Sequence, residues 1–327
     1  MARTASYTCL AEEDWDRKIA DLDAVARTCS LCPRCCGIDR IAGERGFCGA
    51  PGEIVVSSIF PHHGEEPPIS GSRGSGTVFF TFCTLKCVFC QNYQLSHLGE
   101  GKPIAIDDLA KKLVGLQATG CHNINLVTAT HFLPWVVRAL KRASASGLTI
   151  PIVYNCGGYE RPDIIALLSG IVDIYLPDMK YGADGPAAAY SHAADYVAVN
   201  RAAVREMFRQ TGPLRLNDEG IAYRGLCIRH LVLPENRAGT GEILAFLTAT
   251  FDPHDLYISL MAQYKPLFNA PEFPEISRCI ASKEYEPLKN AFTESGFNGF
   301  YQEIEKMDQR FVINFKKRKF ERLTGEE

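Results

Sequence analysis

The chain has 327 residues, of which 46% are hydrophobic, and its formal net charge is −3. This length allows one large α/β domain with an appendage, or two domains. The near-neutral charge provides no general electrostatic field for nucleic acid or membrane surfaces. The sequence shows no secretory signal and no apolar run long enough to cross a bilayer. We therefore expect its thirteen cysteines to bind metal in a reducing cytoplasm rather than to form disulfides.

The first 70 residues are expected to form a helix followed by a cysteine-rich metal-binding segment. Apolar residues at helical spacing predict a helix over residues 12–27 that packs on the main body. Four thiols follow that can ligate one metal centre: Cys29, Cys32, Cys36 and Cys48. Cys35 is a spare thiol that can replace Cys36. Four cysteines suit either a structural zinc or a closed auxiliary iron–sulfur cluster; the alternative is that these thiols bind nothing.

Residues 54–60 are expected to form a short strand, which is followed by a loop rich in histidine, glutamate and proline. His62, His63, Glu65 and Glu66 suggest three interpretations: a second metal site, a surface turn, or the mouth of a pocket. The flanking prolines and glycines favour the turn.

An apolar run over residues 77–82 predicts a buried strand. Three closely spaced thiols follow it: Cys83, Cys87 and Cys90. Three protein thiolates can hold three corners of a cubane iron–sulfur cluster, whereas electron-transfer clusters normally use four. The missing ligand would leave one iron open to a small molecule. The alternatives are a structural zinc knuckle or three unrelated buried thiols, but zinc usually takes cysteines in closely spaced pairs.

The pattern Cys-x3-Cys-x-aromatic-Cys, carried by Cys83, Cys87, Phe89 and Cys90, resembles the signature of the radical S-adenosylmethionine (SAM) enzymes. The resemblance implies a [4Fe–4S] cluster on the three cysteines, with SAM bound at the open iron. Reductive cleavage of SAM would yield methionine and a 5′-deoxyadenosyl radical that abstracts hydrogen from a substrate. Phe89 would pack against adenine, and Asn92 is a further predicted SAM contact.

Strand and helix patterns alternate after the cysteine loop, which predicts parallel pairing in an α/β fold. The strands are expected near residues 77–82, 123–128, 150–154, 172–176, 226–233 and 256–261. The helices are expected near residues 107–118, 132–145, 162–170, 186–193, 196–209 and 241–250. Six such units resemble the partial (β/α)6 TIM-like barrel of the radical SAM family. We assign residues 71–300 to this barrel and residues 301–327 to a basic C-terminal tail.

Active residues of such barrels gather at the C-terminal ends of the strands. This rule selects the predicted SAM contacts Thr128, Thr130, His131, Asn155, Asp178, Lys180 and His230. His131 is equally well interpreted as a helix-capping histidine. Two glycines after Asn155 would let the backbone approach a ligand closely. Gln263, Tyr264 and Lys265 are candidates for the substrate side.

Asp178 and Lys180 point to the same side of an extended segment because they are two residues apart. They resemble the Asp-x-Lys element of glycyl-radical activating enzymes, which implies contacts with the methionine part of SAM and a monovalent cation. A structural salt bridge is the alternative. His230 would reach the SAM ribose and Arg229 a substrate anion, unless both face the outer helices.

Residues 28–265 are most similar to the pyruvate formate-lyase activating enzyme-like (PflX-type) proteins, including Gly-Ser-Gly-Thr-Val-Phe-Phe before the cluster loop. The resemblance implies an external flavodoxin- or ferredoxin-like reductant. The substrate would be a glycyl residue of a partner enzyme, or else a small molecule or another peptide. The true activator lacks a four-cysteine unit at its N-terminus. A non-catalytic iron–sulfur or zinc protein is the alternative from a different class.

Overall fold

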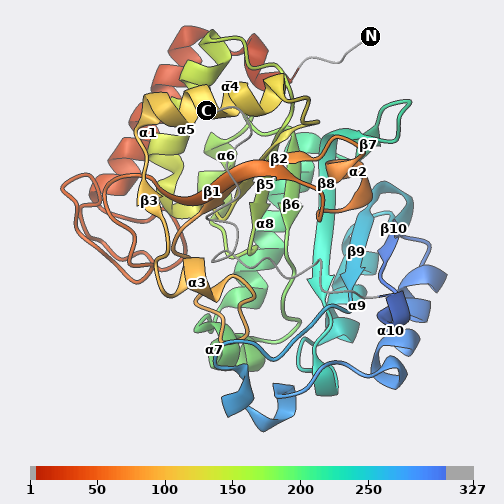
Figure 1. Ribbon diagram of the computed structural model, residues 1–327. Helices are drawn as coiled ribbons and strands as arrows, with labels where there is room; N and C mark the ends of the chain where they lie inside the picture. Colours follow the sequence, from red (N-terminus) through yellow and green to blue (C-terminus); the bar gives the residue numbers. More distant parts are fainter. Residues whose placement is uncertain (1–4, 307–327) are drawn as a thin grey trace, which may run out of the picture.

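A sheet of parallel strands forms the frame of the molecule, and the computed structural model describes residues 5–306 of it (Figure 1). The strand order is β10-β9-β8-β6-β5-β4-β2-β1-β3, with β7 paired to β8. The parallel strands are β2 (Ser75–Phe80), β4 (Ile124–Val127), β5 (Ile152–Cys156), β6 (Ile174–Pro177), β8 (Ala222–Leu231), β9 (Tyr257–Met261) and β10 (Asn298–Tyr301). The antiparallel strands are β1 (Val55–His62), β3 (Lys102–Pro103) and β7 (Arg215–Leu216).

Helices connect the parallel strands and cover the sheet. They are α1 (Glu12–Arg27), α2 (Pro67–Ser70), α3 (Tyr93–Ser96), α4 (Ile106–Ala118), α5 (Leu133–Ala145), α6 (Pro162–Leu167), α7 (Asp184–Ser191), α8 (Tyr196–Thr211), α9 (Thr240–Thr250) and α10 (Ser282–Glu294). Short 3-10 turns lie at Ser6–Cys9, Thr130–Phe132, Pro234–Asn236, Pro253–Asp255, Ala270–Glu272, Pro274–Ile276 and Ile304–Lys306. No helix within residues 5–306 is both long and apolar enough to cross a membrane.

The core lies between the sheet and these helices. In α5, Val136, Val137 and Leu140 are buried at helical spacing, and each such side chain contributes about 1.5–3 kcal/mol when fully buried. Strand β2 is buried at every position, because it has a neighbouring strand on each side and side-chain layers on both faces. This burial explains why β2 shows no regular alternation of apolar and polar residues.

The α/β class and the alternation of parallel strands with helices confirm the predicted fold. All six expected strands form, and the sheet stays open, as in a partial barrel, with β3 and β10 at its edges. Two elements after residue 261 were not expected: α10, and the seventh parallel strand, β10, which pairs with β9. Strand β10 has four residues of intermediate exposure, so it lacks the apolar run that reveals a buried strand.

The predicted N-terminal helix forms as α1 and packs on α5 and α6. Lys141 of α5 holds Glu12 and Asp16 of α1 at 2.6 and 2.5 Å, and Trp15 and Leu22 supply the buried face of α1. The N-terminal part of the chain is thereby attached to the helices of the barrel. The predicted basic tail lies outside the described residues from position 307 onward.

Candidate active site

The loop that follows β2 holds the three predicted cluster ligands in a conformation with unusual backbone angles. Phe82 and Lys86 have φ values of +72° and +59°, in the left-handed region that side-chain-bearing residues seldom adopt. Such conformations cost on the order of 1–3 kcal/mol each and cluster at functional sites. Thr128, at the end of the neighbouring strand β4, has a φ of +60°. Three of the eight non-glycine residues with positive φ in the described part of the chain therefore follow the C-terminal ends of two adjacent strands.

Each of the three thiol sulfurs accepts a hydrogen bond from a different segment. The Leu85 amide donates to Cys83 Sγ at 3.4 Å. The Ser191 hydroxyl donates to Cys87 Sγ at 2.9 Å, and the Ser96 hydroxyl donates to Cys90 Sγ at 3.1 Å. Donors around a thiolate are the interactions that orient and tune metal-ligating cysteines.

The electrostatic surroundings of Cys87 also depend on a later strand. Burial raises the pKa of the Cys87 thiol to about 12, while the charge of Lys180 opposes that rise. Burial likewise raises the pKa of Cys90. A bare thiol here would be protonated at neutral pH, whereas a metal deprotonates a coordinating thiol outright. The hydrogen-bond donors and the nearby ammonium group fit a set of three thiolates.

Within residues 5–306, no group of three or more His, Cys, Asp or Glu side chains is arranged to hold a metal ion. The fit of the three cysteines to a cluster therefore rests on their donors, their strand-end position and their spacing.

A buried polar network lies at the C-terminal ends of β5, β6 and β8. Arg229 is at its centre: the guanidinium donates to Asp178 at 2.8 Å, to Asn155 at 2.7 Å and to Glu65 at 3.5 Å. The Lys180 ammonium donates to the other oxygen of Asp178 at 2.5 Å. The structure thus brings together three of the predicted SAM contacts: Asn155, Asp178 and Lys180.

The pKa values of the two carboxyl groups in this network are shifted in opposite directions. Burial alone would raise the pKa of Asp178, but Arg229 and Lys180 hold it below its ordinary value. Burial raises the pKa of Glu65 to about 7, with Arg229 opposing and Glu66 adding to the rise. Asp178 is therefore an anion paired with two cations, whereas burial favours the neutral form of Glu65.

Glu65 also decides among the interpretations of the loop after β1. Its carboxylate accepts a hydrogen bond from Asn155 at 3.4 Å, across 90 positions of sequence. This contact agrees with the interpretation in which the loop lines the mouth of the site. The sequence left Glu65 open to three interpretations, because its contact with Asn155 is formed only by the fold.

The glycines after Asn155 allow two close approaches within the protein. A Cβ at Gly157 would lie 2.7 Å from Leu85 of the cysteine loop. Gly158 has a φ of +74°, and a Cβ there would overlap the Asp178 carbonyl oxygen. The sequence predicts that both glycines let the backbone approach a ligand. In the structure they place the cysteine loop and the ends of β5 and β6 against one another.

The side chains after β4 are buried and bonded within the protein. The Thr130 hydroxyl donates to Glu160 at 2.7 Å. His131 is 2% exposed, and its Nε2 donates to the Thr81 carbonyl at 2.8 Å. Burial lowers the pKa of His131 to about 3, so its ring is neutral. Thr130 and His131 are thus held inside the protein, and Thr128 has the positive φ described above. The roles of all three residues in SAM binding stay predictions.

His230 is placed on the helix side of β8. Its Nδ1 bonds to the Met179 carbonyl at 2.6 Å and its Nε2 to the Thr240 hydroxyl at 2.9 Å. Both ring nitrogens are thus engaged in the protein, and the side chain is fully buried. Of the two interpretations of this pair, the outward-facing one describes His230, whereas Arg229 points into the polar network.

Two residues of α8 hold the site and were not among the predicted residues. The Tyr196 hydroxyl donates to the Gly157 carbonyl at 2.9 Å and accepts from the Lys180 amide at 2.9 Å. Asn200 donates to the Gly158 and Asp178 carbonyls at 3.0 and 2.9 Å. Their spacing of four residues on one helix face is the only sequence signal, and it is shared by ordinary core positions.

The remaining predicted contacts lie on the β9 side of the cysteine loop. Phe89 is 6% exposed and packs edge-on against Tyr264 and Tyr181, with ring centroids 5.7 and 6.4 Å apart. Asn92 precedes α3, where its carbonyl accepts from the Leu95 amide at 2.9 Å. The roles of Phe89 and Asn92 in SAM binding stay predictions.

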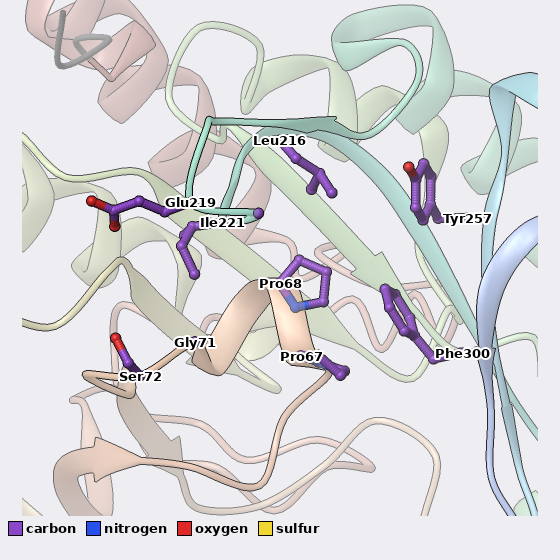
Figure 2. A pocket seen from close by; sticks show the side chains of 10 residues that line it. Pro67, Pro68, Gly71, Ser72, Leu216, Glu219, Ile221, Tyr257 and Phe300 are labelled. Atoms are coloured by element: carbon purple, nitrogen blue, oxygen red, sulfur yellow. The ribbon is translucent and has the colours of Figure 1, made fainter.

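A separate cavity of about 380 Å³ lies near the other ends of β8 and β9. Figure 2 shows Pro67 and Pro68 of α2 facing Leu216, Tyr257 and Phe300 across it. None of the predicted site residues lines this cavity.

The fold and the site define the chain as an α/β protein with a three-cysteine loop at the C-terminal end of its first parallel strand. No family model matches the chain. It is 30% identical over 279 residues to the uncharacterized protein MJ0674 of Methanocaldococcus jannaschii. The aligned region covers 83% of this chain and 76% of MJ0674. The chain belongs to the same family as MJ0674.

Three solved structures are weakly similar. The chain aligns with HydG, a maturase of the [FeFe]-hydrogenase, at 12% identity and a TM-score of 0.48, over 75% of this chain and 56% of HydG. It aligns with a radical SAM methyltransferase from Sphaerobacter thermophilus at 11% identity and a TM-score of 0.44, over 69% of this chain and 65% of the methyltransferase. It aligns with methylornithine synthase (PylB) at 11% identity and a TM-score of 0.41, over 93% of this chain and 82% of the synthase. Similarities this low do not identify the activity of the chain.

Proposed function

We propose that the chain is a radical SAM enzyme. The single observation that carries this proposal is the Cys83–Cys90 loop: the signature spacing lies at the C-terminal end of the first parallel strand, and every thiol sulfur has its own hydrogen-bond donor. Cys83, Cys87 and Cys90 would hold a [4Fe–4S] cluster. When bound, the cluster supplies the electron for reductive cleavage of SAM to methionine and a 5′-deoxyadenosyl radical.

The protein's own residues would bind and orient SAM beside this loop. Lys180 and Arg229 supply two positive charges. Asp178 neutralises one of them, and Glu65, which also pairs with Arg229, neutralises the other only in part because burial favours its protonated form. The remaining positive charge favours a carboxylate such as that of SAM, because pairing in a buried site restores neutrality. Asn155 can exchange its bond with Arg229 for one with the ligand. A monovalent cation beside Asp178 belongs to the same proposal.

The aromatic group around Phe89 would exclude water from the reacting atoms. Phe89, Tyr181 and Tyr264 are each less than a tenth exposed, and they pack edge to face beside the cysteine loop. A closed apolar wall protects a reactive radical from solvent and from stray hydrogen donors.

The reductant and the substrate are finer parts of the proposal. A flavodoxin- or ferredoxin-like protein would supply the electron. We propose a glycyl residue of a partner enzyme as the substrate, on the sequence resemblance to activating enzymes; a small molecule or another peptide is the alternative. Stimulation of 5′-deoxyadenosine formation by a candidate substrate distinguishes them.

The first test is anaerobic reconstitution of the full chain with iron and sulfide, followed by SAM and dithionite. We expect 5′-deoxyadenosine and methionine, and complete loss of both in Cys87→Ala, because two thiols do not hold the cluster. Cys121→Ala is the matched control, since Cys121 is also buried but bonds only to the Thr119 hydroxyl. Absence of 5′-deoxyadenosine from the unmodified chain would refute the proposal.

A further inference from the structure

The cysteine-rich segment after α1 turns back on itself, and three of its four candidate ligand thiols are buried. The Cys29 amide donates to the Ile38 carbonyl at 2.8 Å, and the Gly37 amide donates back to the Cys29 carbonyl at 3.0 Å. This pairing turns the segment back on itself between Cys32 and Cys36. Cys29, Cys32 and Cys48 are each 7% exposed.

The fourth thiol is held by the turn that precedes Cys48. The Phe47 amide donates to Cys36 Sγ at 3.5 Å, and a Cβ at Gly46 would lie only 2.7 Å from the same sulfur. Glycine is therefore required at position 46 for Cys36 to keep its place.

Arg40 is the independent observation that points to a bound group. Its side chain is 1% exposed, yet among residues 5–306 no carboxylate forms an ion pair with it. Its guanidinium donates to the Pro51 and His131 carbonyls at 2.7 and 3.2 Å and approaches Cys48 Sγ at 3.8 Å. Its Nε has no partner. A buried cation without a counter-charge costs several kcal/mol.

Thiolates of this segment are the anions that could neutralise the charge of Arg40. Four neutral thiols leave the guanidinium unpaired, whereas a metal ligated by four thiolates carries net negative charge beside it. Binding the metal releases the four thiol protons to solvent. A zinc ion and an iron–sulfur cluster share this chemistry.

Although these thiols, like those of the Cys83–Cys90 loop, do not form a metal-ligating group in the structure, we propose that Cys29, Cys32, Cys36 and Cys48 hold a second metal centre of net negative charge, zinc or iron–sulfur, with Arg40 as its buried counter-charge. The centre is independent of SAM cleavage, because it shares no ligand with the Cys83–Cys90 loop. Cys35 is excluded from the ligand set because it is exposed and its thiol accepts from Arg161 at 3.2 Å.

The test uses the full chain with Cys83, Cys87 and Cys90 all replaced by alanine, purified anaerobically and analysed for zinc, iron and acid-labile sulfide. We expect about one zinc per chain, or iron with sulfide in the stoichiometry of a single cluster. Visible absorption of iron–sulfur charge transfer identifies the second case, and a colourless zinc protein the first. Retention of neither metal would overturn the proposal.

Two pairs of further variants in this background, each a test variant with its control, test the ligand set and the counter-charge. Cys36→Ser should lose the metal to a chelator at least tenfold faster, whereas Cys35→Ser should not change the rate. Arg40→Gln should also speed the loss, and Arg45→Gln, an exposed neighbour that reaches only the Gly49 carbonyl at 3.4 Å, should not. Circular dichroism of α-helix content checks that each variant is folded. Equal rates for Cys35→Ser and Cys36→Ser in folded chains would refute the ligand assignment.

Discussion

Glu160 is a buried carboxyl group whose pKa differs strongly from that of an exposed glutamate. Glu160 is 1% exposed and accepts hydrogen bonds from Thr130 and Tyr154 at 2.7 and 3.2 Å. Burial raises its pKa from 4.5 to about 8, although these donors act in the opposite direction. Glu160 is therefore a neutral acid in the folded protein at neutral pH and an anion in the unfolded chain.

This difference predicts how stability depends on pH. A raised pKa in the folded state contributes stability that is complete below about pH 4.5 and is lost as pH rises through about 8. We expect Glu160→Gln to flatten this decline, so that the variant gains on the unmodified chain by a few kcal/mol between pH 5 and pH 8.5. Denaturant unfolding at both pH values measures the gain. A constant difference between the two proteins would contradict the assignment.

The ends of β5 and β6 are held together by a contact that only glycine permits. Gly158 combines a φ of +74° with direct apposition to the Asp178 carbonyl, and Asn200 of α8 donates to both backbone carbonyls. The elements that carry Asn155 and Asp178 thus owe their spacing to Gly158.

Gly158→Ala should therefore destabilise the protein by more than the usual cost of a left-handed alanine, which is about 1–2 kcal/mol. Gly220→Ala is the matched control, because Gly220 has the same φ of +74° but no atom within 4 Å of its would-be Cβ. Denaturant unfolding of both variants gives the difference in their free energies of unfolding, which is the cost of the steric clash with Asp178. Equal losses would show that the contact with Asp178 contributes nothing.

At the scale of the molecule, the N-terminal segment is tied to the barrel by Arg34. Its guanidinium donates to the Thr84 carbonyl at 3.0 Å and to the Ser191 carbonyl at 3.1 Å, and also bonds to the His192 carbonyl. Thr84 belongs to the cysteine loop, and the Ser191 hydroxyl donates to Cys87 Sγ. The segment therefore covers the loop and holds it from outside the sheet.

Arg34→Ala should loosen the cysteine loop, because hydrogen bonds from a charged donor contribute about 1.5–3 kcal/mol each. We expect faster amide hydrogen exchange over residues 83–90, with the strands unchanged. Arg45→Ala, from the same segment, should leave this exchange as it is. Unaltered amide protection of the loop in Arg34→Ala would show that Arg34 does not hold the loop in place.

The sequence by itself determined the parts of this protein that depend on local pattern. The three-cysteine loop, helix α1 and six parallel strands could be predicted, because apolar periodicity and ligand spacing are properties of neighbouring residues. Strand β10 could not, since a short half-exposed edge strand has no such periodicity.

Only the tertiary structure decided which polar residues meet. Glu65 and Arg229 are 164 positions apart, and adjacent residues on β8 face opposite sides, so the fold alone sends Arg229 into the network and His230 toward α9. The same reason explains why Arg34 and Arg40 carried no signal: their partners come from distant segments, and long-range proximity is a product of packing.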